Sequence, residues 1–329
     1  MDLYMCHGLT LGVKLLGPDG VAHLEQLLED LSWVRCDHAV SQPLLNLSVG
    51  LDSCKVEIPP TARELFRADD FSGMEVDDAF YLTDGSSSFH CRARTGAGDI
   101  FLSPSFAHKS PLLQRNFWAF ALLKLLRNRS IFSLHAAAVT RNGLGVLIVG
   151  PPGSGKSTLA IGLIRRGWNY LSDDALLLRE NSNGIEALAC RKNFYVNADV
   201  AANYAEFPLA DEVADSYGGT KRRLKIEEAY PAQFLEKCHP TVLLFPRIVA
   251  DRQSVLLPCD RITALRNLLA QSGSQLFDQN SMGKQLDLLA RLLRQTTCYE
   301  LKAGVDLYHD PAVCMQLLQK SQPEQPWLV

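Results

Sequence analysis

Hydrophobic and polar positions divide the chain into a strand-rich first third and a longer region in which strands and helices alternate. Apolar runs predict strands over 9–16 and 45–58, a periodic apolar pattern predicts a helix over 21–31, and 80–102 predicts strands interrupted by glycine-containing turns. Together these elements indicate a small α+β domain over residues 1–108, and nothing in its sequence indicates what this domain does.

A longer helical pattern follows, with apolar residues three or four positions apart from Pro111 to Arg127. We expect this helix, within 109–130, to connect the first domain to a second at 131–321. Residues 322–329 are expected to form a flexible tail. A length of 329 residues agrees with two folded units, since domains average about 150 residues.

In the second region, short apolar runs predict strands that alternate with helices. The predicted strands are 131–139, 144–149, 168–178, 185–189, 241–246 and 297–301, and the predicted helices are 158–166, 261–271, 283–295 and 311–319. Asn142-Gly143 lies between two of these strands and favours a hairpin with a two-residue type I′ turn. If Arg141 pairs with Leu144, His135 lies opposite Gly150. The alternative for His135 is an ordinary core residue.

The segment from Gly150 to Ser157 reads G-x-x-x-x-G-K-S and stands between a predicted strand and a predicted helix. Glycines allow the backbone N–H groups to point inward around phosphate, next to a helix N-terminus. We therefore expect Lys156 to reach the β- and γ-phosphates and Ser157 to bind Mg²⁺. The expected nucleotide-binding residues in this loop are Gly150, Pro151, Pro152, Gly153, Ser154, Gly155, Lys156, Ser157 and Thr158.

Two adjacent carboxylates, Asp173 and Asp174, interrupt the apolar run of 168–178. Burying unpaired charge is costly, so a bound Mg²⁺ and a substrate hydroxyl would explain their position. One Asp would hold the metal and the other would accept the hydroxyl proton. The alternative is a solvated turn at the end of the strand. Which Asp is the base is open from spacing alone.

A basic run follows at 217–225 and contains Arg222 and Arg223. It is either a solvated loop or a mobile lid that brings these arginines onto phosphate oxygens. The leucines of 283–295 favour core packing over a surface for a partner helix.

Composition narrows the classes of function. Hydrophobic residues make up 47% and charged residues 21%, with a net charge of −3, which disfavours nucleic acid as the main partner. The 9 cysteines form no C-x-x-C pair, so we expect neither a zinc site nor a disulfide framework. No segment predicts a signal peptide or a membrane span, and we expect a cytoplasmic protein without a membrane partner.

The combined motifs resemble the catalytic domain of the HPr serine kinase/phosphorylase family. The similar segments are Ser133–Val139, Gly145–Ser157, Arg165–Gly167 and Leu171–Asp174. The resemblance implies an α/β P-loop kinase domain of the HPr kinase and phosphoenolpyruvate carboxykinase-like type, beside the smaller α+β domain. It also implies catalytic roles for Asp173, His135 and Lys156, with Ser157 and Asp174 at Mg²⁺.

The predicted function is ATP- and Mg²⁺-dependent transfer of a γ-phosphoryl group to a hydroxyl, preferably a serine of a protein or peptide. Further copies of the chain are also possible partners. One alternative is a kinase that acts on a small-molecule hydroxyl. Another is a nucleotide-responsive binding protein without phosphoryl transfer. The chain does not contain the E-x-R-G segment of bifunctional HPr kinases, so the acceptor and phosphorolysis are left open.

Overall fold

The computed structural model describes residues 1–16, 24–37, 42–51, 57–67, 71–190, 194–197, 209–214, 220–224, 226–273 and 279–321. The chain forms two compact units. Unit 1 consists of residues 1–132 and 274–285, and unit 2 of residues 133–273 and 286–329.

Unit 1 is built on a nine-stranded sheet with the order β3-β1-β2-β4-β9-β8-β7-β6-β5. Its elements are β1 (Asp2–Cys6), β2 (Leu9–Leu16), α1 (Leu24–Asp30), β3 (Val34–Arg35), β4 (Leu45–Leu51), β5 (Arg63–Arg67), β6 (Ser72–Val76), β7 (Ala79–Thr83), β8 (Ser88–Arg92), β9 (Ala97–Leu102), a 3₁₀ turn (Phe106–His108) and α2 (Pro111–Asn128). The predicted strand over 9–16 and helix over 111–127 are confirmed, and β4 forms the first half of the strand predicted over 45–58, of which 52–56 lie outside the described residues.

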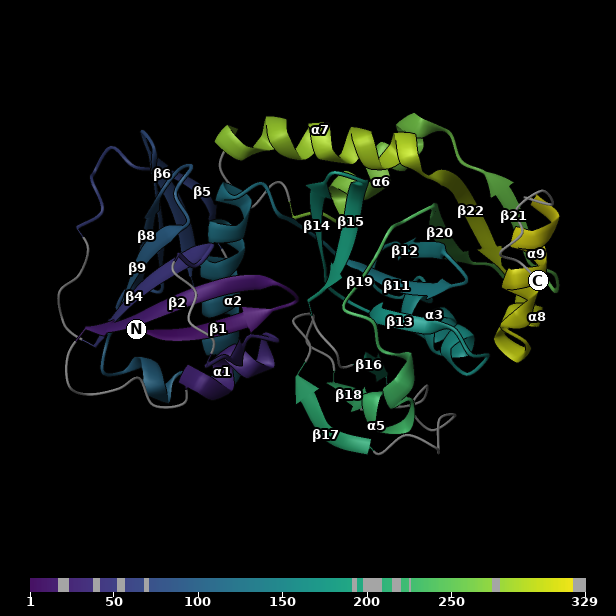
Figure 1. Ribbon diagram of the computed structural model, residues 1–329, viewed down its shortest axis with the longest axis horizontal. Coiled ribbons are helices and arrows are strands. Elements are labelled where there is room, and N and C mark those ends of the chain that lie inside the picture. Colours follow the sequence, from purple (N-terminus) through teal and green to yellow (C-terminus); the bar gives the residue numbers. More distant parts are fainter. Residues whose placement is uncertain are drawn as a thin grey trace. The chain divides into compact units, whose positions relative to one another are not determined.

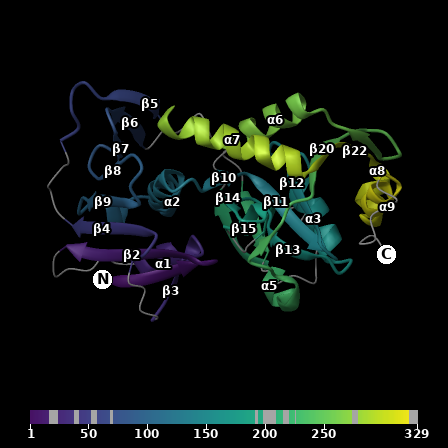
Figure 2. The same ribbon diagram turned by 45° about the horizontal axis from the view of Figure 1, so that its top comes forward.

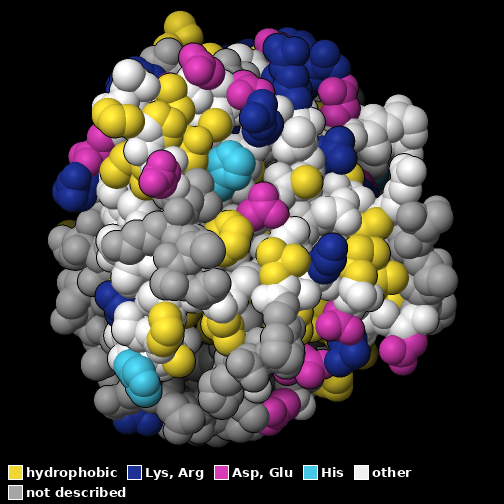
Figure 3. Space-filling view, turned by 90° about the vertical axis from the view of Figure 1, so that its left-hand side faces the viewer, with side chains coloured by type: hydrophobic (Ala, Val, Ile, Leu, Met, Phe, Trp, Pro, Cys, Tyr) yellow, Lys and Arg dark blue, Asp and Glu magenta, His cyan; other side chains and the backbone are white. Residues whose placement is uncertain are grey.

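Helix α2 packs on this sheet through aromatic and aliphatic side chains (Figure 1). The ring of Phe120 lies 5.5 Å from that of Phe66 on β5, and the ammonium of Lys124 lies 5.2 Å from the centre of the Phe80 ring on β7. Ser110 caps the helix by accepting a hydrogen bond from the backbone N–H of Leu113, with Pro111 in the first turn. Among the side chains drawn in colour in Figure 3, basic and acidic groups are intermixed.

Unit 2 contains a six-stranded sheet of order β13-β11-β12-β20-β22-β21, a four-stranded sheet β10-β14-β15-β19 and a three-stranded sheet β16-β18-β17. The strands are β10 (Phe132–Leu134), β11 (Ala136–Arg141), β12 (Leu144–Val149), β13 (Asn169–Ser172), β14 (Leu176–Asn181), β15 (Gly184–Ala189), β16 (Phe194–Asn197), β17 (Leu209–Ala214), β18 (Thr220–Leu224), β19 (Lys237–Cys238), β20 (Val242–Ile248), β21 (Val255–Pro258) and β22 (Thr297–Ala303). The helices are α3 (Lys156–Ile164), α5 (Ile226–Ala229), α6 (Arg261–Ala270), α7 (Gln279–Gln295), α8 (Val305–His309) and α9 (Ala312–Ser321), with a 3₁₀ turn at Pro231–Gln233.

Strands β12, β20 and β22 of the six-stranded sheet are parallel, whereas β11 runs antiparallel to both β12 and β13. Figures 1 and 2 show α6 and the C-terminal part of α7 on the side of this sheet away from α3. Among the described residues, no helix is long and apolar enough to span a bilayer.

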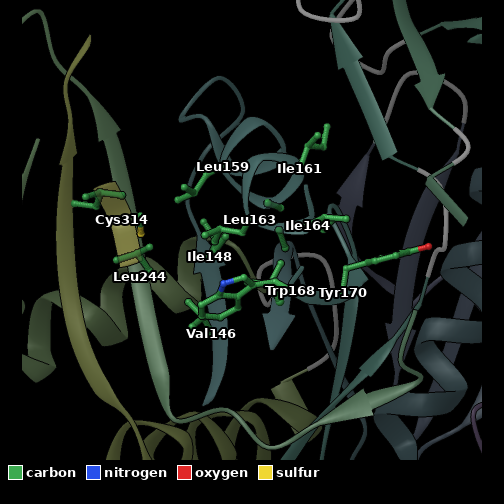
Figure 4. Packing of buried hydrophobic residues seen from close by; sticks show 14 of the residues in the cluster. Val146, Ile148, Leu159, Ile161, Leu163, Ile164, Trp168, Tyr170, Leu244 and Cys314 are labelled. Carbon is green, nitrogen blue, oxygen red and sulfur yellow. The ribbon is translucent and has the colours of Figure 1, made fainter. Parts of the chain in front are cut away.

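Every residue of helix α3 from Leu159 to Ile164 is buried. Its Leu159 and Leu163 pack over Ile148 of β12 and Leu244 of β20, as Figure 4 shows. A Cβ atom added at Gly162 would lie 2.3 Å from Cγ of Pro311, so α3 also contacts the segment that leads into α9. A helix buried in this way lacks the polar face of a surface helix, which explains why residues 159–164 include no polar side chain.

Candidate active site

The predicted hairpin before the glycine-rich loop is confirmed. Strands β11 and β12 pair in the expected register, from Arg141 with Leu144 to Ala136 with Val149. Asn142 and Gly143 have φ angles of 50° and 84°, as a type I′ turn requires. His135 is one residue beyond the last pair, which is the register position opposite Gly150. The hairpin therefore fixes His135 beside the start of the loop.

The loop from Gly150 to Gly155 joins β12 to the N-terminus of α3. Gly153 and Gly155 have φ angles of 80° and 91°, in the left-handed region that glycine adopts without strain. A Cβ atom at Gly150 would lie 2.7 Å from Oγ of Ser154, so the loop requires glycine there as well. The N-cap residue of α3 is Gly155, which has no side chain to bond the N–H groups of the first turn, and such groups at a helix N-terminus suit an anion.

Lys156 is the first residue of α3, and its side chain turns back over the loop. Its Nζ atom donates hydrogen bonds to the carbonyl oxygens of Gly150 at 2.7 Å and Pro151 at 3.1 Å. The side chains of Ser157 and Thr158, the next two residues, are half-buried. The Ser154 hydroxyl is buried and has no hydrogen-bond partner among the described residues. An ammonium, a buried hydroxyl and uncapped N–H groups form a donor set that suits phosphate oxygens.

The acid pair lies at a bend. A single strand over 168–178 was predicted, and this is wrong: β13 ends at Ser172 in the six-stranded sheet, and β14 begins at Leu176 in the four-stranded sheet. Asp173 and Asp174 occupy the turn between the two sheets. The chain changes partners there, from β11 to β15, and this frees both carboxylates from the alternation of a strand.

The two carboxylates have different surroundings. Asp173 is 1% exposed, whereas the side chain of Asp174 is 32% exposed and its Oδ1 lies 3.0 Å from Nδ1 of His135. An ionised carboxylate can accept hydrogen bonds but cannot donate them, so Nδ1 of His135 carries the proton in this contact. The backbone N–H of His135 donates to the carbonyl of Gln271, after the end of α6, at 2.7 Å. Sequence patterns gave no sign of this support from Gln271.

Strand direction explains why these groups meet. Since β11 is antiparallel to both neighbours, its first residues lie between the last residues of β12 and β13. His135 therefore stands between the loop at Gly150 and the bend at Asp173. Strands lie about 4.8 Å apart, so the loop and the acids are roughly 10 Å apart across the sheet. This edge brings together a phosphate cradle, an imidazole and two carboxylates.

Both expectations for the basic run at 217–225, a solvated loop and a mobile lid, required a loop. The run is not wholly a loop. Its described part forms β18, between β16 and β17. Along the backbone, Arg222 pairs with Val196 and Glu212, and Arg223 pairs with Tyr195. The side chain of Arg222 is half-buried, and that of Arg223 is outside the described side chains. Leu224 packs in the same hydrophobic cluster as the leucines of α3.

No group of three or more His, Cys, Asp or Glu side chains in the described parts of the chain could hold a metal ion by itself. The oxygen donors Ser157 and Asp174 suit Mg²⁺, which keeps several water ligands and takes few from protein. The described cysteines are not in disulfides.

Residues 129–194 match the family model described as HPr Serine kinase C-terminal domain. The chain is similar to the HPr kinase/phosphorylase of Chlorobium chlorochromatii (strain CaD3), with 41% identity over 59 residues that cover 18% of each protein. It is also similar to that of Bordetella pertussis (strain Tohama I / ATCC BAA-589 / NCTC 13251), with 38% identity over 84 residues that cover 24% of this chain and 27% of the relative. The matched part is thus a small share of each relative.

A structural comparison gives the Hpr(Ser) kinase/phosphatase from Coxiella burnetii, with 12% identity, 58% of this chain and 97% of that chain covered, and a TM-score of 0.30. This score is too low to support any conclusion about a shared fold. The sequence match is the informative one, because it contains His135, the loop and both acids. The predicted resemblance is confirmed: over residues 129–194 the chain is similar to the HPr serine kinase C-terminal domain.

Proposed function

We propose that the chain is an ATP-dependent kinase that transfers the γ-phosphoryl group to a hydroxyl, preferably a serine of a protein or peptide. The observation that carries the proposal is the register of β11, which puts His135 between the glycine-rich loop and the acid pair. A site that only bound nucleotide would need the loop and a metal ligand. It would not need a buried carboxylate beside them.

The loop residues would hold the nucleotide. Lys156 and the N–H groups of the first turn of α3 would bind the β- and γ-phosphates, with the Ser154 hydroxyl as a further donor. Ser157 and Asp174 would hold Mg²⁺. When bound, this ion would neutralise charge that develops on the phosphate oxygens.

Asp173 is the proposed base. The hydroxyl oxygen of the acceptor forms a bond to the γ-phosphorus as the bond from that phosphorus to the β,γ-bridging oxygen breaks, and ADP leaves. The hydroxyl proton passes to the carboxylate of Asp173. Burial suits this role, because a carboxylate removed from water is a stronger proton acceptor. His135 is a positioning residue, since its Nδ1 holds Asp174.

We infer further that residues 131–321 form a P-loop kinase domain similar to phosphoenolpyruvate carboxykinase, and that residues 1–108 form a separate domain joined by α2. Arg222 and Arg223 are proposed to bind phosphate oxygens, but from a strand instead of a loop. The proposed setting is the cytoplasm, where ATP and reduced thiols coexist. Self-association of the chain stays a prediction.

The test follows label from γ-labelled ATP with Mg²⁺ to serine-containing proteins and peptides and to small hydroxyl compounds. We expect transfer to serine in the wild type. Lys156→Ala should lose both ATP binding and transfer. Asp173→Asn should bind ATP normally and lose about 10²- to 10⁴-fold in rate. Asp174→Asn should raise the Mg²⁺ concentration needed for half-maximal rate. Asp287→Asn, an exposed carboxylate on α7, is the control.

Label that passes only to water, or full activity in Asp173→Asn, would overturn the proposal. Transfer to a small compound but to no protein would favour the small-molecule kinase instead. Binding of ATP without any transfer would favour the nucleotide-responsive protein.

A further inference from the structure

The strand next to the glycine-rich loop ends in an exposed isoleucine. Strand β20 runs parallel to β12, with Val242 paired to Val146 and Leu244 to Ile148. Its first five residues are buried, but its last two emerge into solvent, and Ile248 is 62% exposed. A single exposed apolar residue is ordinary on a protein surface. Ile248 differs from other exposed apolar residues because it lies next to the glycine-rich loop.

The side chain of Ile248 lies on the α3 side of the sheet. Val242 and Leu244 pack with α3 in one hydrophobic cluster, and side chains alternate along a strand, so Ile248 shares their face. A Cβ atom added at Gly155 would lie 3.7 Å from Cδ1 of Ile248. Ile248 therefore lies directly beside the residue that precedes α3.

His135 occupies the corresponding place on the other flank. His135 immediately precedes β11, in the register position opposite Gly150, and its imidazole contacts Asp174. The N-terminus of α3 thus has a polar flank on the β11 side, with His135 and the acids. It has an apolar flank on the β20 side, with Ile248.

These flanks fix the direction of a bound nucleoside triphosphate. The γ-phosphate must lie next to the acids if the proposed transfer is to occur, because Asp173 accepts the proton of the attacking hydroxyl. The remaining phosphates follow the loop and the start of α3. The nucleoside end must then leave on the opposite flank, over β20.

We propose that Ile248 is the apolar platform on which the base of the nucleotide lies. A purine ring offers a flat apolar face, and covering an exposed isoleucine removes apolar surface of both groups from water. Side chains alternate along a strand, so the neighbouring Arg247 lies on the opposite face of the sheet from Ile248. Its Nε donates to Glu300 at 3.3 Å, and its side chain therefore does not cover Ile248. The inference rests on the proposed function, since it takes its direction from the site of transfer.

The test compares two ligands that share a triphosphate chain, of which only ATP carries a nucleoside. Calorimetric titration with ATP and with inorganic tripolyphosphate, each with Mg²⁺, is carried out on wild type and Ile248→Ala. We expect the Kd for ATP to rise about tenfold in the variant, as expected for loss of one apolar contact. The Kd for tripolyphosphate should change less than about twofold. Ile262→Ala removes another exposed isoleucine, 83% exposed on α6, and should change neither value.

If Ile248→Ala lowers the affinity for both ligands equally, or leaves the affinity for ATP unchanged, Ile248 is not the platform for the base. The kinase assignment would still stand. Failure of the wild type to bind either ligand would overturn the proposed function and the platform with it. Lys156→Ala should weaken both ligands alike, which separates a phosphate contact from a base contact.

Discussion

Nδ1 of His135 lies 3.0 Å from Oδ1 of Asp174, and this contact makes the two neighbouring acids unequal. Asp174 is held by an imidazole and is partly open to solvent, whereas Asp173 is buried. Spacing in the sequence left the roles of the two acids interchangeable. Their surroundings favour Asp174 as the metal ligand and Asp173 as the base.

Loss of the imidazole should slow transfer without abolishing ATP binding. We expect His135→Ala to lower kcat about 10- to 100-fold, because residues that hold a metal ligand contribute on that scale. His135→Asn should recover part of the loss, since an amide can also donate to Asp174. Steady-state kinetics with varied Mg²⁺ measures both effects. His90→Asn is the control, as His90 lies against Tyr81 in unit 1, with ring centroids 5.0 Å apart, and unaltered kcat in His135→Ala would contradict the assignment.

Gly150 tests the shape of the loop. A methyl group there would lie 2.7 Å from Oγ of Ser154 but 3.3 Å from its Cβ. We therefore expect Gly150→Ala to weaken ATP binding about tenfold or more, because displaced loop atoms bind phosphate poorly. Gly150→Ala should cost less affinity in a Ser154→Ala background than in the wild type, since the clashing oxygen is absent from that background. Calorimetry on the wild type, the two single variants and the double variant decides, and equal losses in the two backgrounds would count against this clash.

Alanine substitutions at two glycines outside the loop should change the free energy of unfolding in opposite directions. Gly143 has a φ of 84° and no atom near its Cβ position, so Gly143→Ala should cost about 1 kcal/mol through backbone strain alone. Gly283 is exposed inside α7 with nothing near its Cβ position, so Gly283→Ala should stabilise by about 0.5–1 kcal/mol. Urea unfolding of both variants gives the two signs, and equal signs would refute the argument.

Lys124 should make the stability of the protein depend on pH. Burial lowers the pKa of its ammonium to about 8 from 10.5, so the unfolded chain binds the proton more tightly. Stability should therefore rise with pH between about 8 and 10.5, by about 3 kcal/mol at 1.4 kcal/mol per unit. Lys124→Met should remove this rise. The difference between the urea unfolding free energies of the two proteins, measured from pH 7 to 10, isolates the effect, and a constant difference would disprove it.

Features set by neighbouring residues were predictable, and features set by distant partners were not. The turn at Asn142-Gly143 and the pairing of Arg141 with Leu144 follow from local backbone geometry. The bend at Asp173 does not, because one apolar run supplies strands to two sheets whose other members lie elsewhere in the chain. Similarly, β18 pairs with β16 and β17, so a basic run became a strand.

Ile248 shows the same limit in another form. In the sequence it follows the predicted strand 241–246 and comes directly after Arg247, and no pattern there indicates whether its side chain is buried. Its exposure depends on how far β20 extends past β12, and that register is not written in the run itself. The support that Gln271 gives to His135 is equally distant, 136 positions along the chain by the difference of their numbers.

The antiparallel placement of β11 also has a consequence for folding. His135, the loop and both acids come from one continuous segment of hairpin, helix and strand, so their contacts have low sequence separation. The β20 strand that carries Ile248 joins this segment only after a loop of nearly a hundred residues closes between Val146 and Val242. The groups that would perform the chemistry can therefore assemble early in folding, and the surface that would select the base is added later.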